Sequence, residues 1–531
     1  MLKPNLELPP VFQRLYVGFA ALRTGFVGGC RPIIGLKKKA REVIERDQRV
    51  QYAKVYDYCE TVRLHNPNSV MQVVVDRPNE NMLKPNLELP PVFQRLYVGF
   101  VALRTGFVGG CRPIIGLDGC HLKGIYGGQL LCALGRDEND NYFPISWVAI
   151  EAESKDSCVW FLRQLMDDIG SADDMGWVFI SDKQKRLVPA FEEVMPNVEH
   201  KFYMRHIYSN FRAKFKGLEL RDLLWKAAAV GTVREFEFHM NKLKEMDPEK
   251  KAYKWLRKID PTLWTRSYFS PRSRCDTLVN MCESFNNNIL EARDKSIISM
   301  LEWIRRRVMH RIQIKKEGME KYTGEICPNI VKDLEALKVH ARNCFATSCG
   351  DRKFEVDCGD TTHIVDLEER KCSYRMWDLT GIPCKHAINS IFVQREKSED
   401  YVHPYYSKRN YLVAYNSMMH PVPGQHDWVE IGLPAVAPPL YEKQPGKPPK
   451  MRKKGIDEPI NPVRVSRQHR FIVCARCLQK GHNQRSCKGP VHPKSKLFKP
   501  TRSNQQQPFS AATTTASSTL ATATTTSYQV T

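Results

Sequence analysis

Two short apolar runs that each end in an aspartate constrain the fold of this chain more than any other feature. Residues 113–117 (PIIGL) lead into Asp118, and residues 177–181 (WVFIS) lead into Asp182. Short, almost continuous apolar runs predict strands in the middle of a sheet. Two strands that deliver carboxylates to the same end of a sheet make a site for a hard divalent metal ion.

The segment between these runs predicts a hairpin and a helix. Residues 127–153 contain two strand-like runs on either side of the polar turn RDENDN. Residues 157–170 (SCVWFLRQLMDDIG) then place apolar side chains at helical spacing, namely Val159, Phe161, Leu162, Leu165, Met166 and Ile169. Strands and helices in this order predict an α/β fold.

Charge and cysteine content restrict the class of protein. The formal net charge is +23, which predicts a polyanionic partner. The 17 cysteines are odd in number and partly clustered, which favours metal ligation in a reducing compartment over a disulfide framework. No run of about 18 apolar residues is present, so we expect no membrane span. The first ten residues, MLKPNLELPP, do not have the pattern of a signal peptide.

One segment occurs twice. Residues 1–36 and 82–117 differ only at Ala20 and Val101. Only the second copy continues into Asp118, so we predict that it supplies the strand and that residues 1–36 are a non-structural duplicate. A single, nearly perfect copy is typical of a recent duplication or of an assembly error, because functional repeats diverge and form arrays.

The rest of the chain divides by composition. Residues 37–81 have helical and then strand character, residues 211–270 form a helical insertion, and Glu283 lies near the start of the longest amphipathic stretch. Further divisions are a small module of a strand pair and a helix at 353–395, a Pro-rich basic linker at 419–462 and a low-complexity tail at 503–531. In the small module, we expect Ala387, Ile388, Ile391 and Phe392 to pack against the strands.

Residues 470–490 contain the strongest local signal. The ligand types and spacing, Cys474-x2-Cys477-x4-His482-x4-Cys487, fit a closed tetrahedral zinc site known as a CCHC knuckle. Gly481 permits the tight turn, and basic neighbours suit contacts with nucleic-acid phosphates.

The motifs LDGCHLKG, GGQLL, NYFPI, VWFLRQL, FISDKQK, RHIYSNF, CESFN and LTGIPCKHAI together resemble the Mutator-like element (MULE) transposases of plants. The resemblance covers roughly residues 40–400. It implies a ribonuclease-H-like transposase domain at 82–320, with a catalytic triad of two aspartates and a glutamate. Asp118 and Asp182 match the aspartates, and Glu283 of CESFN is the candidate for the third acid. It also implies a SWIM zinc finger at 353–395.

The sequence departs from the family pattern at several places. A SWIM finger has C-x-C and then C-x-H; here Cys372, Cys384 and His386 are present, but Tyr374 stands where the second cysteine belongs. A neutral phenol is a poor zinc ligand. Tyr203 and Arg186 replace a cysteine and a glycine, and LVNMCE is one asparagine short. A single G-to-A transition is sufficient for each of the three replacements (Tyr374, Tyr203 and Arg186). Our hypothesis is that they mark a silenced, decaying element.

These observations predict a transposon-encoded transposase that cleaves and transfers DNA strands with Mg²⁺ or Mn²⁺, or a decayed inactive copy of one. Zinc is expected in the finger and the knuckle. The alternative is a non-enzymatic, zinc-dependent DNA-binding regulator derived from a transposase; a third interpretation is an RNA-binding knuckle protein. The expected partner is DNA, at transposon ends or genomic sites, and the expected compartment is the nucleus. The sequence leaves open whether the chain is active and whether it forms a homo-oligomer.

Overall fold

The computed structural model describes residues 47–77, 89–182, 186–276 and 281–439, and in the C-terminal part residues 474–479, 487, 489–493 and 495. The chain divides into two units, residues 1–447 and 448–531. The predicted duplicate at 1–36, most of the linker at 419–462 and the tail at 503–531 lie outside the described residues. In the described ranges, no helix is both long and apolar enough to cross a membrane.

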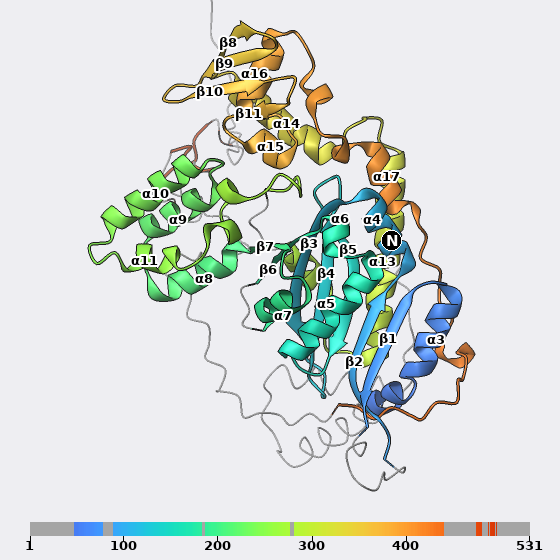
Figure 1. Ribbon diagram of the computed structural model, residues 1–531. Coiled ribbons are helices and arrows are strands. Elements are labelled where there is room, and N and C mark those ends of the chain that lie inside the picture. Colours follow the sequence, from blue (N-terminus) through green and yellow to red (C-terminus); the bar gives the residue numbers. More distant parts are fainter. Residues whose placement is uncertain are drawn as a thin grey trace, which may run out of the picture. The chain divides into compact units, whose positions relative to one another are not determined.

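The first unit is built on a seven-stranded mixed sheet with the strand order β1-β2-β5-β4-β3-β6-β7 (Figure 1). The pairs β1/β2, β2/β5, β5/β4 and β4/β3 are antiparallel, whereas β3/β6 and β6/β7 are parallel. The predicted α/β class is confirmed by this large mixed sheet and the helices that follow its strands. The strands are β1 Val70–Asp76, β2 Val92–Gly99, β3 Arg112–His121, β4 Gln129–Arg136, β5 Tyr142–Ile150, β6 Val178–Ser181 and β7 Glu199–Phe202.

The hairpin and the helix predicted between the two aspartates are both present. β4 and β5 form the hairpin, and α5 (Lys155–Ile169) follows. Ser154 caps α5 by accepting a hydrogen bond from the Ser157 backbone, and the Ser157 side chain accepts one in return. The apolar stripe of α5 is buried in the main hydrophobic core. The other helices in this region are α3 (Val55–His65), α4 (Val101–Gly110), α6 (Ala172–Met175) and α7 (Leu187–Val194).

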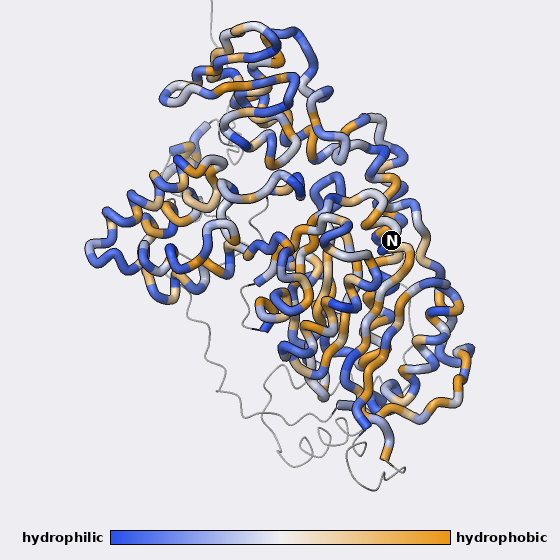
Figure 2. Tube along the Cα trace, in the orientation of Figure 1, coloured by the Kyte–Doolittle hydropathy of each residue, from blue (hydrophilic) through white to orange (hydrophobic). Residues whose placement is uncertain are grey.

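The predicted helical insertion has a hydrophobic core of its own. It follows β7 and is separate from the core under the sheet, and it includes Leu224, Phe236, Met240 and Trp264. Figure 2 shows hydrophobic residues along the sheet strands and on the inner sides of these helices. The helices are α8 (Met204–Lys214), α9 (Leu218–Ala229), α10 (Val233–Met246) and α11 (Lys251–Arg257).

The long amphipathic stretch is divided into two helices. α12 (Cys282–Asn288) carries Glu283 and ends in a series of turns, and α13 (Ile297–Glu320) begins after them. Because the turns separate the two helices, α12 can contact β3 independently of α13. The apolar side of α13 packs into the main core. α14 (Pro328–Ala341) comes next.

The small module is larger than the strand pair predicted at 353–395. It has a four-stranded antiparallel sheet in the order β11-β10-β9-β8, because the chain before residue 353 supplies β8 as an edge strand. Ala387, Ile388 and Ile391 are buried as predicted, but Phe392 is 45% exposed and does not pack there. The elements of the module are β8 Phe345–Gly350, β9 Lys353–Asp357, β10 Thr362–Asp366, β11 Lys371–Cys372, α15 Met376–Thr380 and α16 Lys385–Val393. The helix α17 (Lys408–Asn416) follows and packs on α4 and α13 of the main core.

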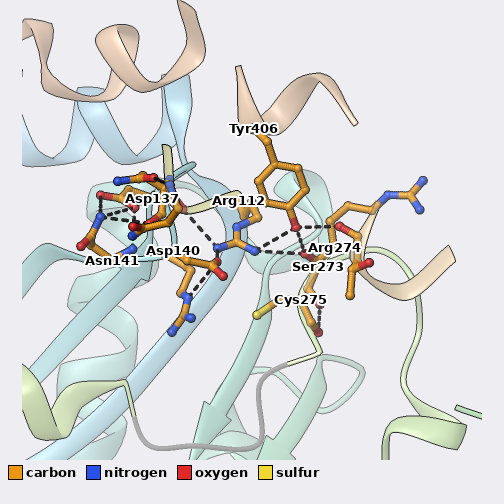
Figure 3. Close-up of polar contacts among 12 residues, drawn as sticks. Arg112, Asp137, Asp140, Asn141, Ser273, Arg274, Cys275 and Tyr406 are labelled. Atoms are coloured by element: carbon orange, nitrogen blue, oxygen red, sulfur yellow. Dashed lines mark hydrogen bonds and ion pairs between the residues drawn. The ribbon is translucent and has the colours of Figure 1, made fainter. Parts of the chain in front are cut away.

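Arg112, the first residue of β3, anchors the strand in a buried polar network (Figure 3). Its guanidinium pairs with Asp140 in the β4–β5 turn and donates to the Asp137 carbonyl (3.1 Å) and to the Tyr406 hydroxyl (3.1 Å). Burial would raise the pKa of Asp140, but Arg112 and Arg136 outweigh it and lower that pKa to about 2. One side chain therefore ties the start of β3 to the hairpin turn and to a segment almost 300 residues away in the sequence.

Candidate metal centres

Asp118 and Asp182 lie side by side on neighbouring strands. The parallel register of β3 and β6 runs from Ile114 opposite Val178 to Leu117 opposite Ser181. Asp118 is the next residue of β3, and Asp182 directly follows the end of β6. Neighbouring strands are about 4.8 Å apart, so the two carboxylates start from adjacent backbone positions. The sequence predicted that Asp118 ends its strand, and this prediction is wrong. β3 continues to His121 because residues 118–121 still pair with β4.

Asp118 is held by groups on two elements. Its Oδ2 accepts a hydrogen bond from Nδ2 of Asn286 on α12 (2.9 Å), and its Oδ1 accepts one from the Gly119 backbone (2.9 Å). α12 can come this close because Gly116 has no side chain. A Cβ at that position would lie 2.6 Å from both the Tyr203 hydroxyl and a Met281 carbon. Gly116 therefore sets the distance between the strand and the helix.

Asp182 is paired with His206 from the first turn of α8. The His206 Nε2 lies 2.6 Å from the Asp182 Oδ1. Burial would lower the pKa of His206, but the hydrogen bond to Asp182 and the negative charges of Asp182 and Asp118 outweigh it, so that the pKa is raised. The cationic form of the imidazole is therefore favoured beside Asp182.

Glu283 is on the same side of the sheet, on α12, and forms an ion pair with Arg205 of α8. Glu283 and Asn286 are three residues apart, so they share one face of α12, and Asn286 on that face reaches Asp118. The three acids are therefore neighbours through α12 and α8. Their oxygens are not gathered as tightly as a metal-bound set: in the described part of the chain, no three ligand atoms within 4.8 Å of one another include these residues.

Arg205, His206 and Asn286 were not predicted as site residues. Two signals were available for them. His206 lies three residues after Tyr203, where the family pattern has a cysteine and a histidine, and Asn286 follows Glu283 inside the motif CESFN. Each of these residues contacts one of the three acids.

A second cluster lies in the small module. Cys372 of β11, Cys384 before α16 and His386 on α16 bring their ligand atoms within 4.8 Å of one another, and all three are buried. Both sulfurs face the same ring nitrogen of His386, at 3.8 Å from Cys372 and 3.7 Å from Cys384. The structure therefore brings together the three SWIM ligands that the sequence retains.

The environment of Cys384 favours a thiolate. Burial would raise its pKa, but hydrogen bonds from Cys372 and His386 and from the backbone of Ala387 outweigh it and lower the pKa. Cys384 is the N-cap of α16, where the helix dipole also favours negative charge. Thiolates are the sulfur form that binds zinc, so the donor set fits this ion.

Tyr374 does not join this ligand group. Its ring stands edge-on to the His386 ring, with centroids 5.1 Å apart, and it is also in contact with the His363 ring. The ring therefore occupies space beside the cluster and contributes packing.

The knuckle cysteines also meet. The sulfurs of Cys474, Cys477 and Cys487 lie within 4.8 Å of one another. The Leu478 backbone donates to the Cys474 carbonyl (2.8 Å), which closes a tight turn between the first two cysteines. Burial would raise the pKa of Cys474, but backbone N–H groups of Cys477 and Arg476 lower it to about 6. His482, the fourth predicted ligand, lies outside the described residues, so the CCHC assignment stays a prediction.

Two protein-family models match the chain, one in the large sheet and one in the small module. Residues 114–210 match the MULE transposase domain, which covers β3 to α8 and includes Asp118, Asp182 and His206 but not Glu283. Residues 354–388 match the SWIM zinc finger and include Cys372, Cys384 and His386. No curated protein matches the chain. The matches and the Cys/His cluster together indicate zinc as the ion of the small module. The chain carries a MULE transposase domain followed by a SWIM zinc finger.

Proposed function

We propose that this chain is a transposase that cleaves and transfers DNA strands at a site formed by Asp118, Asp182 and Glu283. The observation that carries the proposal is the register of β3 and β6, which makes the two aspartates neighbours on adjacent strands. The match of residues 114–210 to the MULE transposase domain supports a transposase-related function for this sheet.

The donor set suits Mg²⁺ or Mn²⁺, because carboxylate oxygens are the ligands that hard divalent cations prefer. Asp118 and Asp182 would hold the ions and Glu283 would complete the set from α12. Ions bound there would activate water and stabilise the leaving oxygen in phosphodiester cleavage.

The neighbouring residues have definite tasks in this proposal. Asn286 and the Gly119 backbone fix the carboxylate of Asp118 by donating to its two oxygens. His206 holds Asp182, and Arg205 holds Glu283. Both cations are partly exposed, with 37% and 57% of their side chains accessible, so they can also face a DNA phosphate. The net charge of +23 favours DNA as the partner by the same attraction.

The second candidate is a zinc-dependent, DNA-binding regulator without catalytic activity. It is favoured by the ion pair that engages Glu283 and by Tyr374, which leaves the SWIM finger one ligand short of its pattern. Both candidates act on DNA, and for both we propose a nuclear location and leave the oligomeric state open. In the third candidate, only the knuckle is functional and its partner is RNA.

Strand cleavage by the purified full chain tests the proposal. The substrate is DNA that carries the ends of the element's own genomic copy, with Mg²⁺ or Mn²⁺. We expect nicking at the ends that is lost in Asp118→Asn, Asp182→Asn and Glu283→Gln. Glu291→Gln is the matched control, because Glu291 is a nearby exposed acid.

Two results would contradict the proposal. Specific DNA binding without cleavage under both metals would favour the regulator. Cleavage that survives Glu283→Gln but not Glu291→Gln would assign the third acid to Glu291.

A further inference from the structure

The small module contains more metal-ligand side chains than a SWIM finger uses. Cys344 and Cys358 lie near His386, and their sulfurs and one ring nitrogen of that histidine are within 4.8 Å of one another. Cys344 is 2% exposed, His386 is fully buried and Cys358 is half-buried. His386 therefore belongs to two groups of ligands, one with Cys372 and Cys384 and one with Cys344 and Cys358.

The strand pairing explains why these two cysteines meet. Phe345 of β8 is opposite Asp357 of β9, so Cys344 and Cys358 are the next residues outward on the two antiparallel strands. Side chains at opposite positions of such a pair have Cβ atoms about 5 Å apart. The thiol pair is thus built by the fold, although the two residues are separated by 13 others and show no short motif in the sequence.

The His386 ring has one nitrogen still unaccounted for. Nδ1 faces Cys372 and Cys384. Nε2 is buried and has no hydrogen-bond partner in the described part of the chain. Buried polar atoms without a partner are rare in proteins and call for an explanation, and a metal ion is one partner that an imidazole nitrogen accepts.

We propose that Cys344 and Cys358 bind zinc together with His386. Two thiolates and one imidazole nitrogen are ligands of the type zinc prefers, and each thiol releases its proton to solvent when the ion binds. With Cys344 and Cys358 as ligands, the module can bind zinc even though Tyr374 replaces a SWIM cysteine. The proposal does not depend on strand cleavage, because it concerns only the zinc content of the small module.

Zinc and cobalt binding by the full chain tests this assignment. The background is Cys474→Ser/Cys477→Ser/Cys487→Ser, which removes all three thiols of the knuckle. In this background we compare Cys358→Ser with Cys349→Ser, since Cys349 is an exposed thiol of β8 that belongs to neither group. We expect Cys358→Ser to weaken zinc binding about tenfold or more and to reduce the thiolate-to-cobalt absorption. Cys349→Ser should leave both unchanged.

Equal zinc affinity and equal cobalt spectra for Cys358→Ser and Cys349→Ser would overturn the assignment. A Cys344–Cys358 disulfide found by mass spectrometry in zinc-loaded protein that was purified under reducing conditions would also overturn it. Cys344→Ser alters a buried position, so its result counts only where far-UV circular dichroism matches the parent; the half-buried Cys358 gives the decisive comparison.

Discussion

The acids beside the large sheet and the thiols of the small module are both groups of metal-type ligands, but their surroundings differ. Each acid already contacts a donor on another element: Asn286 for Asp118, His206 for Asp182 and Arg205 for Glu283. Cys372 and Cys384 instead face the buried His386, and neither has a Lys or Arg as a hydrogen-bond partner among the residues that the structure describes.

The difference follows from the chemistry of the groups. A carboxylate beside a sheet is charged in water and is stabilised by nearby cations and N–H groups. A thiol behaves as a small apolar group until a metal ion or a base removes its proton. Carboxylates can therefore lie at a partly exposed surface, where groups of the same chain donate hydrogen bonds to them. Thiols can instead be buried in a hydrophobic core.

Asp118→Asn should reduce metal-dependent strand cleavage about 10³-fold, corresponding to roughly 4 kcal/mol of transition-state stabilisation. The amide keeps the shape of the side chain but loses the charge that a divalent cation requires. Single-turnover cleavage rates measure the effect, and the thermal unfolding temperature should stay close to that of the parent. A variant that cleaves at the parental rate would remove Asp118 from the site.

Arg112→Leu should destabilise the first unit by about 3 kcal/mol, because it leaves the buried partners of the guanidinium without their donor. Arg163→Leu is the matched control. Arg163 also forms an ion pair, with Glu193, but its side chain is 60% exposed, and exposed pairs contribute little. Urea unfolding measures both variants. Equal destabilisation by the two variants would mean that burial does not determine how much an ion pair contributes to the stability of this unit.

Glu138→Gln should change how stability depends on pH. Neither carboxylate oxygen of Glu138 has a hydrogen-bond partner among the described residues, and burial together with the charge of Asp137 raises its pKa to about 8. Because the folded pKa lies above the ordinary value, the stability that this group contributes is present at low pH and is lost as the pH rises towards 8.

The parent should therefore lose about 2 kcal/mol relative to Glu138→Gln between pH 6 and pH 8. Urea unfolding at both pH values measures this difference, with the exposed Glu291→Gln as the control. Parallel pH profiles for the parent and Glu138→Gln would show that Glu138 is ionised in the folded protein at both pH values.

Tyr374→Cys should strengthen zinc binding by the small module about tenfold, since it restores the thiolate that the SWIM pattern has at this position. It should raise the thermal unfolding temperature only when zinc is present. Competition with a chromophoric chelator measures the affinity. Equal affinity for the parent and the variant would mean that Tyr374 does not stand in the place of a lost ligand.

The parts of the fold that could be predicted from the sequence are those with strong local periodicity. The apolar run before Asp118, the hairpin around RDENDN and the helix α5 form the expected strand, hairpin and helix, although β3 continues beyond Asp118. The resemblance to MULE transposases was needed to select Glu283, because a glutamate on an amphipathic helix is ordinarily a surface residue.

The contacts that depend on pairing of distant segments could not be predicted. Cys344 and Cys358 are neighbours only because β8 pairs with β9, and β8 lies before the predicted start of the module. Asn286 reaches Asp118 only because Gly116 lets α12 approach the strand. Phe392 has helical spacing suited to burial, yet it is exposed, since the end of α16 extends past the small sheet's apolar core.

The position of Arg205 and His206 at the start of α8 makes the helical insertion a partner of the acids. The helix α8 contributes Ile207 and Phe211 to the insertion's own core, so it is packed as part of that core. Arg205 and His206 are thus attached to the helical insertion. The acids that they contact, Glu283 and Asp182, are attached to the main core. Any ligand that shifts the helical insertion would move Arg205 and His206 together. This movement would change the electrostatic potential at Glu283 and Asp182.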